Sequence, residues 1–284
     1  AIDAEYNEKR IYAISQLTSA MCENEAYGIK RYGSREDVEA LTAADMYEYW
    51  QNALKNSRVE VMMLGSSNPN MAQKIIAERF SQLQRRVPEI KTEIIKTPAK
   101  VKSVTETSDI AQAKLVMGFR TASAEPEDDT VPMSLTVAIL GGTPSSKFFL
   151  NVREKLSLCY YCAARFDKLK GIVIVDSGVE KENIQRTVEE IKNQLADMQK
   201  GNITDFEINS AKLALANNLK SSQDTLSGTE AWYIGQMLDR KLSTVDEVVN
   251  ALNSVTKETI VKLANTIKLD TVYLLQPNSS KEAE

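Results

Sequence analysis

The chain has 284 residues, of which 43% are hydrophobic and 26% are charged, and this length suffices for one large domain or two modest ones with a buried core. The formal net charge is −4 and no basic block is present, which argues against a nucleic acid partner, and no apolar run approaches the roughly 20 residues of a membrane span. The sequence contains no histidine, which excludes the commonest zinc ligand, the commonest general base and every serine–histidine or cysteine–histidine catalytic arrangement.

The three cysteines are an odd number for a chain of this length, which argues against a disulfide framework. Free cysteines are typical of a reducing compartment, so we expect a cytoplasmic protein. The chain begins at Ala1, inside a polar, helix-like segment and without an initiator methionine. We therefore expect it to be part of a longer protein.

Residues 1–87 are predicted to be mostly helical. Apolar residues near helical spacing predict one long helix over 2–26, and Thr42 is expected to cap a helix that carries Met46 and Trp50. A strand is predicted over 58–65 (RVEVMMLG), and another helix follows it over 70–83. Residues 88–108 are rich in Lys, Thr and Glu, and we interpret them as a linker with a short extended piece at 101–104.

Residues 109–284 are predicted to form a complete domain. Strands are predicted over 113–120, 158–166, 171–178 and 271–276, the middle two as a hairpin across the turn DKLKG. Helices are predicted around 135–140, after a cap at Ser145 or Ser146 and leading to Arg153, and then over 181–199, 204–222, 225–239, 245–252 and 256–266. The fold class is therefore α+β, a mixed or antiparallel sheet with helices packed on it.

An internal echo links the two blocks. Residues 36–65 and 246–276 share one order of features: a short helix, a capping Thr, an amphipathic helix, a polar turn and a strand. The second block holds three strands and several helices before this closing unit, whereas the first holds one helix. We therefore expect 1–87 to be the C-terminal portion of a domain homologous to 109–284.

Cys159 and Cys162 have the spacing of redox and zinc motifs. Redox pairs of this kind lie where a strand enters a helix, whereas this pair begins a strand, which should point the two sulfurs to opposite faces. A zinc site would need two further ligands, and Cys22 is the only other cysteine of the sequence. We interpret the pair as structural strand residues.

Arg153 and Tyr160 lie where a predicted helix gives way to a strand. Taken alone, they are an ordinary surface arginine and a half-buried strand tyrosine. However, the segment LGGTPSSKFFLNVREKLSLCYY (140–161), with the hairpin that follows, resembles the second-domain signature of the insulinase/pitrilysin metallopeptidases. The family's Arg-Glu-Lys at a helix end, with a Tyr seven positions after the Arg, is matched by Arg153, Glu154, Lys155 and Tyr160.

Within that family the similarity is to the bacterial branch related to mitochondrial processing peptidase. Residues 22–54 also resemble the end of the family's first domain, so the similarity runs along most of the chain. The resemblance implies two homologous α/β domains, joined by a linker, that face each other across a peptide chamber. It further implies that the first domain supplies a His-x-x-Glu-His zinc motif and that the second supplies the Arg and Tyr.

By this resemblance, Arg153 and Tyr160 are the expected catalytic site residues: they bind the peptide substrate and support the oxyanion of the tetrahedral intermediate. No residue can be carried over as a metal ligand or general base, and none is expected to bind a cofactor. The resemblance therefore implies zinc in a missing N-terminal part or in a homologous partner subunit. The chain alone is expected to be inactive.

Two functions remain open. The main expectation is the non-zinc portion or subunit of an insulinase-type zinc metallopeptidase, with peptide substrate and a zinc-bearing homologous subunit, or its own N-terminal domain, as partners. The alternative is a catalytically inactive scaffold or assembly homologue of the same superfamily. Neither a nucleic acid nor a membrane is expected as a partner.

Overall fold

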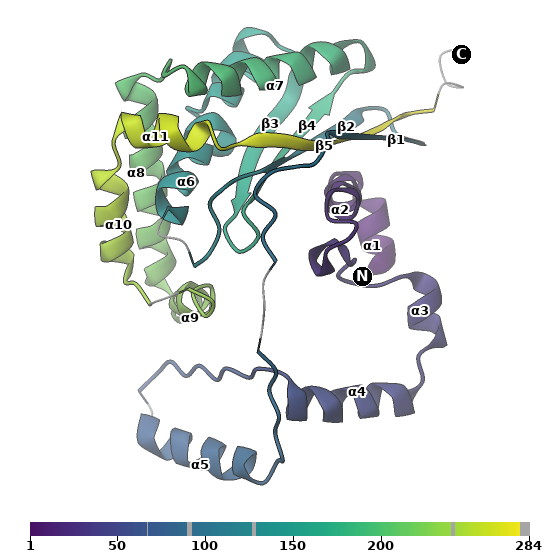
Figure 1. Cartoon of the computed structure of the whole chain (residues 1–284), viewed down its shortest axis with the longest axis vertical. Coiled ribbons are helices and arrows are strands. Elements are labelled where there is room, and N and C mark those ends of the chain that lie inside the picture. The colour runs from purple at the N-terminus through teal and green to yellow at the C-terminus, as the bar shows by residue number, and fades with distance from the viewer. Residues whose placement is uncertain (67, 90–92, 127–128, 240–241, 279–284) are drawn as a thin grey trace.

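The computed structural model describes residues 1–284 except 67, 90–92, 127–128, 240–241 and 279–284 (Figure 1). Its α-helices are α1 (Ile2–Asn7), α2 (Lys9–Met21), α3 (Arg35–Ala40), α4 (Ala43–Asn56), α5 (Pro69–Ser81), α6 (Thr130–Val137), α7 (Ile184–Gln199), α8 (Asp205–Ser221), α9 (Leu226–Ile234), α10 (Val245–Ser254) and α11 (Lys257–Ala264). Its strands are β1 (Lys102–Ser108), β2 (Ala113–Arg120), β3 (Cys159–Asp167), β4 (Ile172–Val179) and β5 (Lys268–Pro277).

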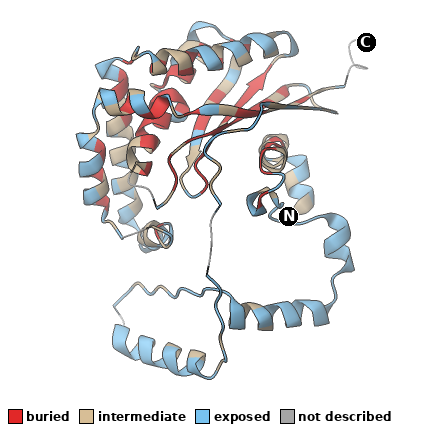
Figure 2. Cartoon of the chain, viewed as in Figure 1, coloured by how far each residue is buried: buried red, intermediate tan, exposed pale blue. Residues whose placement is uncertain are grey.

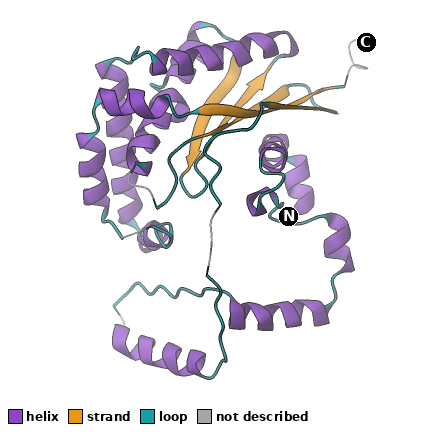
Figure 3. Ribbon diagram, in the orientation of Figure 1, coloured by secondary structure: helices purple, strands orange, loops and turns teal. Residues whose placement is uncertain are grey.

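Among the described residues, the strands form one mixed sheet in the order β1-β5-β2-β4-β3 (Figure 3). β1 pairs with β5 in parallel, and the other neighbours are antiparallel. The strands predicted in the second block are confirmed, as is the hairpin of β3 and β4. The α+β fold class is confirmed as well. No helix in the described part of the chain combines the length and apolar character needed to cross a membrane.

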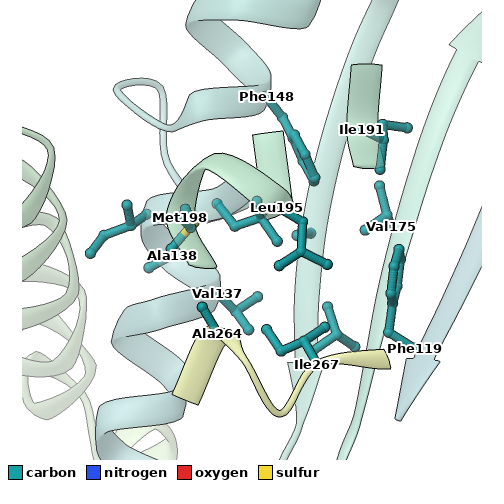
Figure 4. Packing of buried hydrophobic residues seen from close by; sticks show 14 of the residues in the cluster. Phe119, Val137, Ala138, Phe148, Val175, Ile191, Leu195, Met198, Ala264 and Ile267 are labelled. Carbon is teal, nitrogen blue, oxygen red and sulfur yellow. The ribbon is translucent and has the colours of Figure 1, made fainter. Parts of the chain in front are cut away.

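The main core lies between one face of this sheet and the helices that cover it. Phe119 and Val175 project from the sheet, and Ile191 and Leu195 of α7 meet them (Figure 4). Phe148, from the helix before β3, completes this part of the cluster. Burial of each such side chain contributes about 1.5–3 kcal/mol. The apolar face predicted for the helix over 181–199 is therefore confirmed.

The opposite face of the sheet is covered by α2. Ala13 and Leu17 are fully buried there and pack with Val116, Tyr273 and Leu275, which makes α2 the buried helix of the N-terminal region in Figure 2. The prediction of one helix over 2–26 is wrong at both ends of α2. Glu8 leaves the helical backbone conformation and caps α2, its carboxylate accepting from the Arg10 amide, and the helix ends at Met21.

A buried ion cluster fixes the turn that follows α2. Arg120, at the end of β2, donates to Glu25 at 2.6 Å and to Asp270 of β5 at 2.9 Å, and also to the Met21 carbonyl at 3.0 Å. Lys170, in the β3–β4 turn, pairs with Glu25 from the other side. Because unpaired buried charges are strongly unfavourable, this cluster explains why the chain leaves the helix before Glu25.

The segment after this turn is exposed: no described residue between 26 and 112 is buried (Figure 2). The predicted cap of α4 is confirmed, since Thr42 and Asp45 form a capping box. The strand predicted over 58–65 is wrong: among the residues that the structure describes, no strand lies beside this segment to complete its backbone hydrogen bonds. The extended piece predicted at 101–104 is longer than expected and forms β1. The domain boundaries at 87 and 108 stay a prediction.

The internal echo is present in the helices. α3 and α4 in the first copy match α10 and α11 in the second, and Thr42 and Thr256 cap the second helix of each pair. The closing strand exists only in the second copy, as β5, where β1 and β2 flank it. The two copies therefore differ in whether neighbouring strands are present for the closing strand to pair with.

Candidate functional site around Arg153 and Tyr160

The helix that carries Arg153 spans Phe148–Lys155 and is wound as a π-helix. The hydroxyl of Ser146 accepts from the amide of Phe149 at 3.4 Å, so the predicted role of this serine at the helix start is confirmed. Phe148 and Val152 bury one side of the helix in the core. Arg153 is therefore left on the outer side, where 41% of its side chain is exposed. Short π-helical segments are frequent at functional sites.

A tight turn joins this helix to β3. Ser157 adopts a left-handed backbone conformation with φ of 50°, which is uncommon for a residue other than glycine. The amide of Leu158 donates back to the Val152 carbonyl at 3.1 Å, and the Leu158 side chain is buried. This turn brings the start of β3 beside the end of the helix.

Tyr160 occupies a β-bulge at the start of β3. Cys159 is paired with Val179 of β4, and Tyr161 is already paired with Gly178, so Tyr160 is the extra residue of the ladder. A bulged residue is left without a cross-strand partner and its strand bends. The ring of Tyr160 consequently points outward and is 61% exposed.

The bulge also overturns the prediction for the two cysteines. Cys159 lies opposite Val179 and Cys162 opposite Ser177, and these partners are two positions apart on β4. Because residues two apart in a strand share a face, both sulfurs lie on the helix-covered face of the sheet. Both residues contact the main core cluster. The expectation of opposite faces is wrong because it counted a regular alternation through a residue that the bulge inserts.

An open cavity of about 390 Å³ lies at this junction. It is lined by Arg153, Glu154, Ser157, Leu158, Cys159, Tyr160, Glu180 and Asn183. The structure thus brings Arg153 and Tyr160, separated by seven positions in the sequence, to the walls of one cavity. Cys159 lies on the same walls.

The two predicted site residues are each held by a neighbour. The Arg153 guanidinium lies 4.7 Å from the centre of the Phe149 ring and 3.3 Å from a Glu154 carboxylate oxygen. The Tyr160 hydroxyl donates to Glu180, and this hydrogen bond raises the pKa of the hydroxyl above its usual value. Tyr160 is therefore a protonated hydrogen-bond donor at neutral pH, and Arg153 supplies positive charge beside it.

The thiols of the pair differ in acidity. A hydrogen bond from Cys162 lowers the pKa of the Cys159 thiol to about 7, against the opposing effect of burial, and the charge of Arg153 lowers it further. The same hydrogen bond, together with burial, raises the pKa of Cys162 well above its usual value. Cys159 is thus the thiol of this pair that ionises first. The separation of the two cysteines by two residues is the sequence signal for an interacting pair. Regular alternation along the strand, which the bulge breaks, predicts instead that the sulfurs lie on opposite faces.

The family model described as the peptidase M16 inactive domain matches residues 40–215. The chain belongs to the peptidase M16 family. The resemblance to the insulinase/pitrilysin metallopeptidases is thereby confirmed, and the chain is an inactive-domain homologue within the M16 family.

Curated relatives of this M16 chain are bacterial. It is 30% identical over 275 residues to "Probable inactive metalloprotease YmfF" of Bacillus subtilis, covering 97% of this chain and 65% of the relative. It is 24% identical over 253 residues to "Uncharacterized zinc protease YmxG" of the same organism, covering 87% of this chain and 60% of the relative. The chain thus spans less than two thirds of the length of either protein.

Solved structures share the fold of this M16 chain. A conserved protein from Enterococcus faecalis V583 superposes with a TM-score of 0.86 at 24% identity, covering 99% of this chain and 66% of that one. A peptidase M16 inactive domain from Pseudomonas fluorescens gives a TM-score of 0.80 at 18% identity, covering 99% and 68%. At such identities the likeness establishes the fold alone.

The M16 family implies zinc, and the described residues of this chain do not fit a zinc site. Within the described parts of the chain, no three or more His, Cys, Asp or Glu side chains are grouped so as to hold a metal ion. At the cavity, Glu154 pairs with Arg153 and Glu180 accepts from Tyr160, so both carboxylates are already engaged.

Proposed function

We propose that this chain is a catalytically inactive M16 component that assembles with a zinc-bearing polypeptide, or a zinc-bearing segment, of the same family. One observation carries the proposal: the sequence matches the family over most of its length yet contains no histidine with which to build the family's zinc motif. A chain of this kind acts through what it binds rather than through a metal of its own.

The exposed region between α3 and β1 supports a role in assembly. Met46, Tyr49 and Trp50 of α4 are all more than half exposed, and Val61, in the extended segment that follows α4 in the chain, is 56% exposed. Exposed large apolar side chains gathered on one helix are typical of an interaction site. The segment 58–65 also offers backbone groups without a strand partner, which a neighbouring sheet can pair.

The test is co-expression of this chain with an M16 polypeptide that carries His-x-x-Glu-His, followed by light scattering after size-exclusion chromatography. We expect a stoichiometric complex, and we expect Trp50→Ser to weaken it about 30-fold, as for a central interface residue. Leu213→Ser, at a similarly exposed apolar position on α8, is the matched control and should leave affinity unchanged. Absence of a complex at micromolar concentration, or equal effects of the two variants, contradicts the proposal.

A second candidate function is peptide binding with support of the transition state. It is favoured by the position of Arg153 and Tyr160 on the walls of one open cavity. A protonated phenol can donate to a carbonyl oxygen as negative charge develops on it, and a guanidinium can hold neighbouring substrate carbonyls. Both groups would act on a peptide delivered to this cavity from the complex.

Kinetics of the reconstituted complex separate the two functions. If the pair supports the transition state, Tyr160→Phe lowers kcat by about 100- to 1,000-fold, and Arg153→Ala raises KM or lowers kcat. Tyr233→Phe and Arg186→Ala, on α9 and α7, are matched controls at positions that do not line the cavity. Unchanged turnover in both site variants would contradict transition-state support and leave assembly as the remaining proposed function.

A further inference from the structure

We propose that Cys159 and Cys162 form a reversible redox pair in the wall of this cavity, in which Cys159 reacts with a small hydroperoxide and Cys162 resolves the product to a disulfide. This goes beyond the assembly and peptide-binding functions and does not depend on either. The pair is a modification site, and its state is set by the chemistry of the surroundings.

The bulge makes the pairing possible. Without it, residues three apart on a strand point to opposite faces, and the two sulfurs could not meet. With Tyr160 inserted, Cys159 and Cys162 lie opposite Val179 and Ser177, and both side chains contact the main core cluster on the same face of the sheet. The two thiols thus lie on the same face of one strand, with Tyr160 bulged between them.

The solvent exposure of the two cysteines assigns them different roles in the reaction. Cys159 is partly exposed and lines the open cavity, whereas Cys162 lies behind it and is only 6% exposed. A small oxidant entering the cavity therefore reaches Cys159 first. The charged and titratable groups that face the cavity with it are Arg153, Glu154, Tyr160 and Glu180.

The acidities agree with this order. The pKa of Cys159 is lowered to about 7, chiefly by the hydrogen bond from Cys162, and further by Ser177 and the Arg153 charge. A thiolate is the nucleophilic form, and exposed thiols of lowered pKa beside a second cysteine are typical redox sensors. The raised pKa of Cys162 keeps it protonated until the sulfur next to it has been oxidised.

The chemistry balances as a two-electron oxidation. The Cys159 thiolate attacks the terminal oxygen of ROOH, the O–O bond breaks, and the alkoxide or hydroxide that leaves takes up a proton, which yields Cys159 sulfenic acid. The Cys162 sulfur then attacks the Cys159 sulfur, the S–O bond breaks, and the thiol proton leaves with the hydroxide as water. Two thiols and one hydroperoxide become one disulfide, one alcohol (or water) and one water.

The disulfide changes the cavity. A disulfide holds its sulfurs about 2.05 Å apart, closer than a hydrogen bond between thiols allows, so its formation draws Cys159 and Cys162 together beneath the bulge. Tyr160 lies between them in sequence and depends on the bulge for its outward position. Oxidation is therefore expected to move the Tyr160 ring relative to Glu180 and Arg153.

The test uses the whole chain treated with hydrogen peroxide near neutral pH, then alkylated and digested with trypsin. Cleavage after Lys155 and Arg165 yields the single peptide 156–165, which contains both cysteines. We expect this peptide to appear two hydrogens lighter and unlabelled after oxidation, and to carry two labels again after treatment with dithiothreitol. Cys22, fully buried with the pKa of its thiol raised to about 11, is the internal control and should keep its thiol.

Two variants assign the roles. In Cys162→Ser the reaction should stop at a sulfenic acid on Cys159 that dimedone traps, and in Cys159→Ser neither product should form. Before any oxidant is added, iodoacetamide should label Cys159 at least about tenfold faster than Cys22 near neutral pH, since the pKa values of the two thiols differ widely. Two alkylatable cysteines in peptide 156–165 after peroxide, or a disulfide that links two chains, would overturn the proposal even if the variants fail to fold.

Discussion

Buried charged side chains in this molecule are paired with side chains of opposite charge, and Arg120 is the clearest case. The residue is 1% exposed, and its guanidinium contacts Glu25, Asp270 and the Met21 carbonyl. Arg120→Met removes the shared partner of two buried carboxylates, Glu25 and Asp270, while Lys170 still pairs with Glu25. We expect a loss of about 3–5 kcal/mol in the free energy of unfolding, measured by urea denaturation.

The exposed Arg186 of α7 gives the matched control at the same scale. Arg186→Met should change the free energy of unfolding by less than about 0.5 kcal/mol, as is usual for surface substitutions. A similar, small effect of both variants would mean that the cluster beneath α2 is not formed in solution.

At the scale of elements, the approach of α2 to the sheet depends on Gly118 of β2. A Cβ at this position would lie 2.6 Å from Met21 Sδ and 3.2 Å from Leu17 Cδ2. Gly118→Val should therefore push α2 away from the sheet and destabilise the chain by about 1–3 kcal/mol. Hydrogen exchange should quicken in α2 while α7, on the other face, keeps its protection; equal changes in both helices would count against a local effect.

Features that are determined by the local sequence could be predicted from it, whereas features that depend on a partner distant in the chain could not. The spacing of Ile191, Leu195 and Met198 in α7 is decided within the helix, so sequence alone places its buried face. The bulge at Tyr160 is decided by the pairing of β3 with β4, and nothing in residues 159–162 reveals it. The predicted strand over 58–65 has the right composition and lacks a sheet to join.

The candidate site follows the same division. The family motif placed Arg153 and Tyr160 in one neighbourhood, whereas their spacing alone did not. The spacing of Cys159 and Cys162 is visible in the sequence, but a regular alternation of side chains along the strand predicts that the two sulfurs lie on opposite faces. The end of α2 at Met21 is likewise not predicted, because its cause is the pairing of Glu25 with Arg120 and Lys170, which lie far from it in the sequence.

The whole molecule combines a packed body with a long exposed segment. α2 and the sheet with its helices share buried contacts, whereas α4 and α5 stand apart from the sheet in Figure 1 and contain no buried residue. Sites of proteolysis concentrate in exposed, weakly packed segments. Brief digestion of the 284-residue chain with trypsin should therefore cut first between α2 and β1, at positions such as Arg31, Arg58 and Arg86.

After that digestion, the N-terminal peptide that contains α2 should stay bound to the C-terminal body. Leu17 and Ala13 are buried against the sheet, and Glu25 is held by Arg120 and Lys170, so severing the exposed segment leaves these contacts intact. Size-exclusion chromatography followed by mass spectrometry should find both fragments in one peak. The same digestion of Arg120→Met should release the peptide, because Glu25 then loses its main partner. Early cleavage within the sheet, or loss of the peptide from the unaltered chain, would show that α2 and the sheet do not form one body.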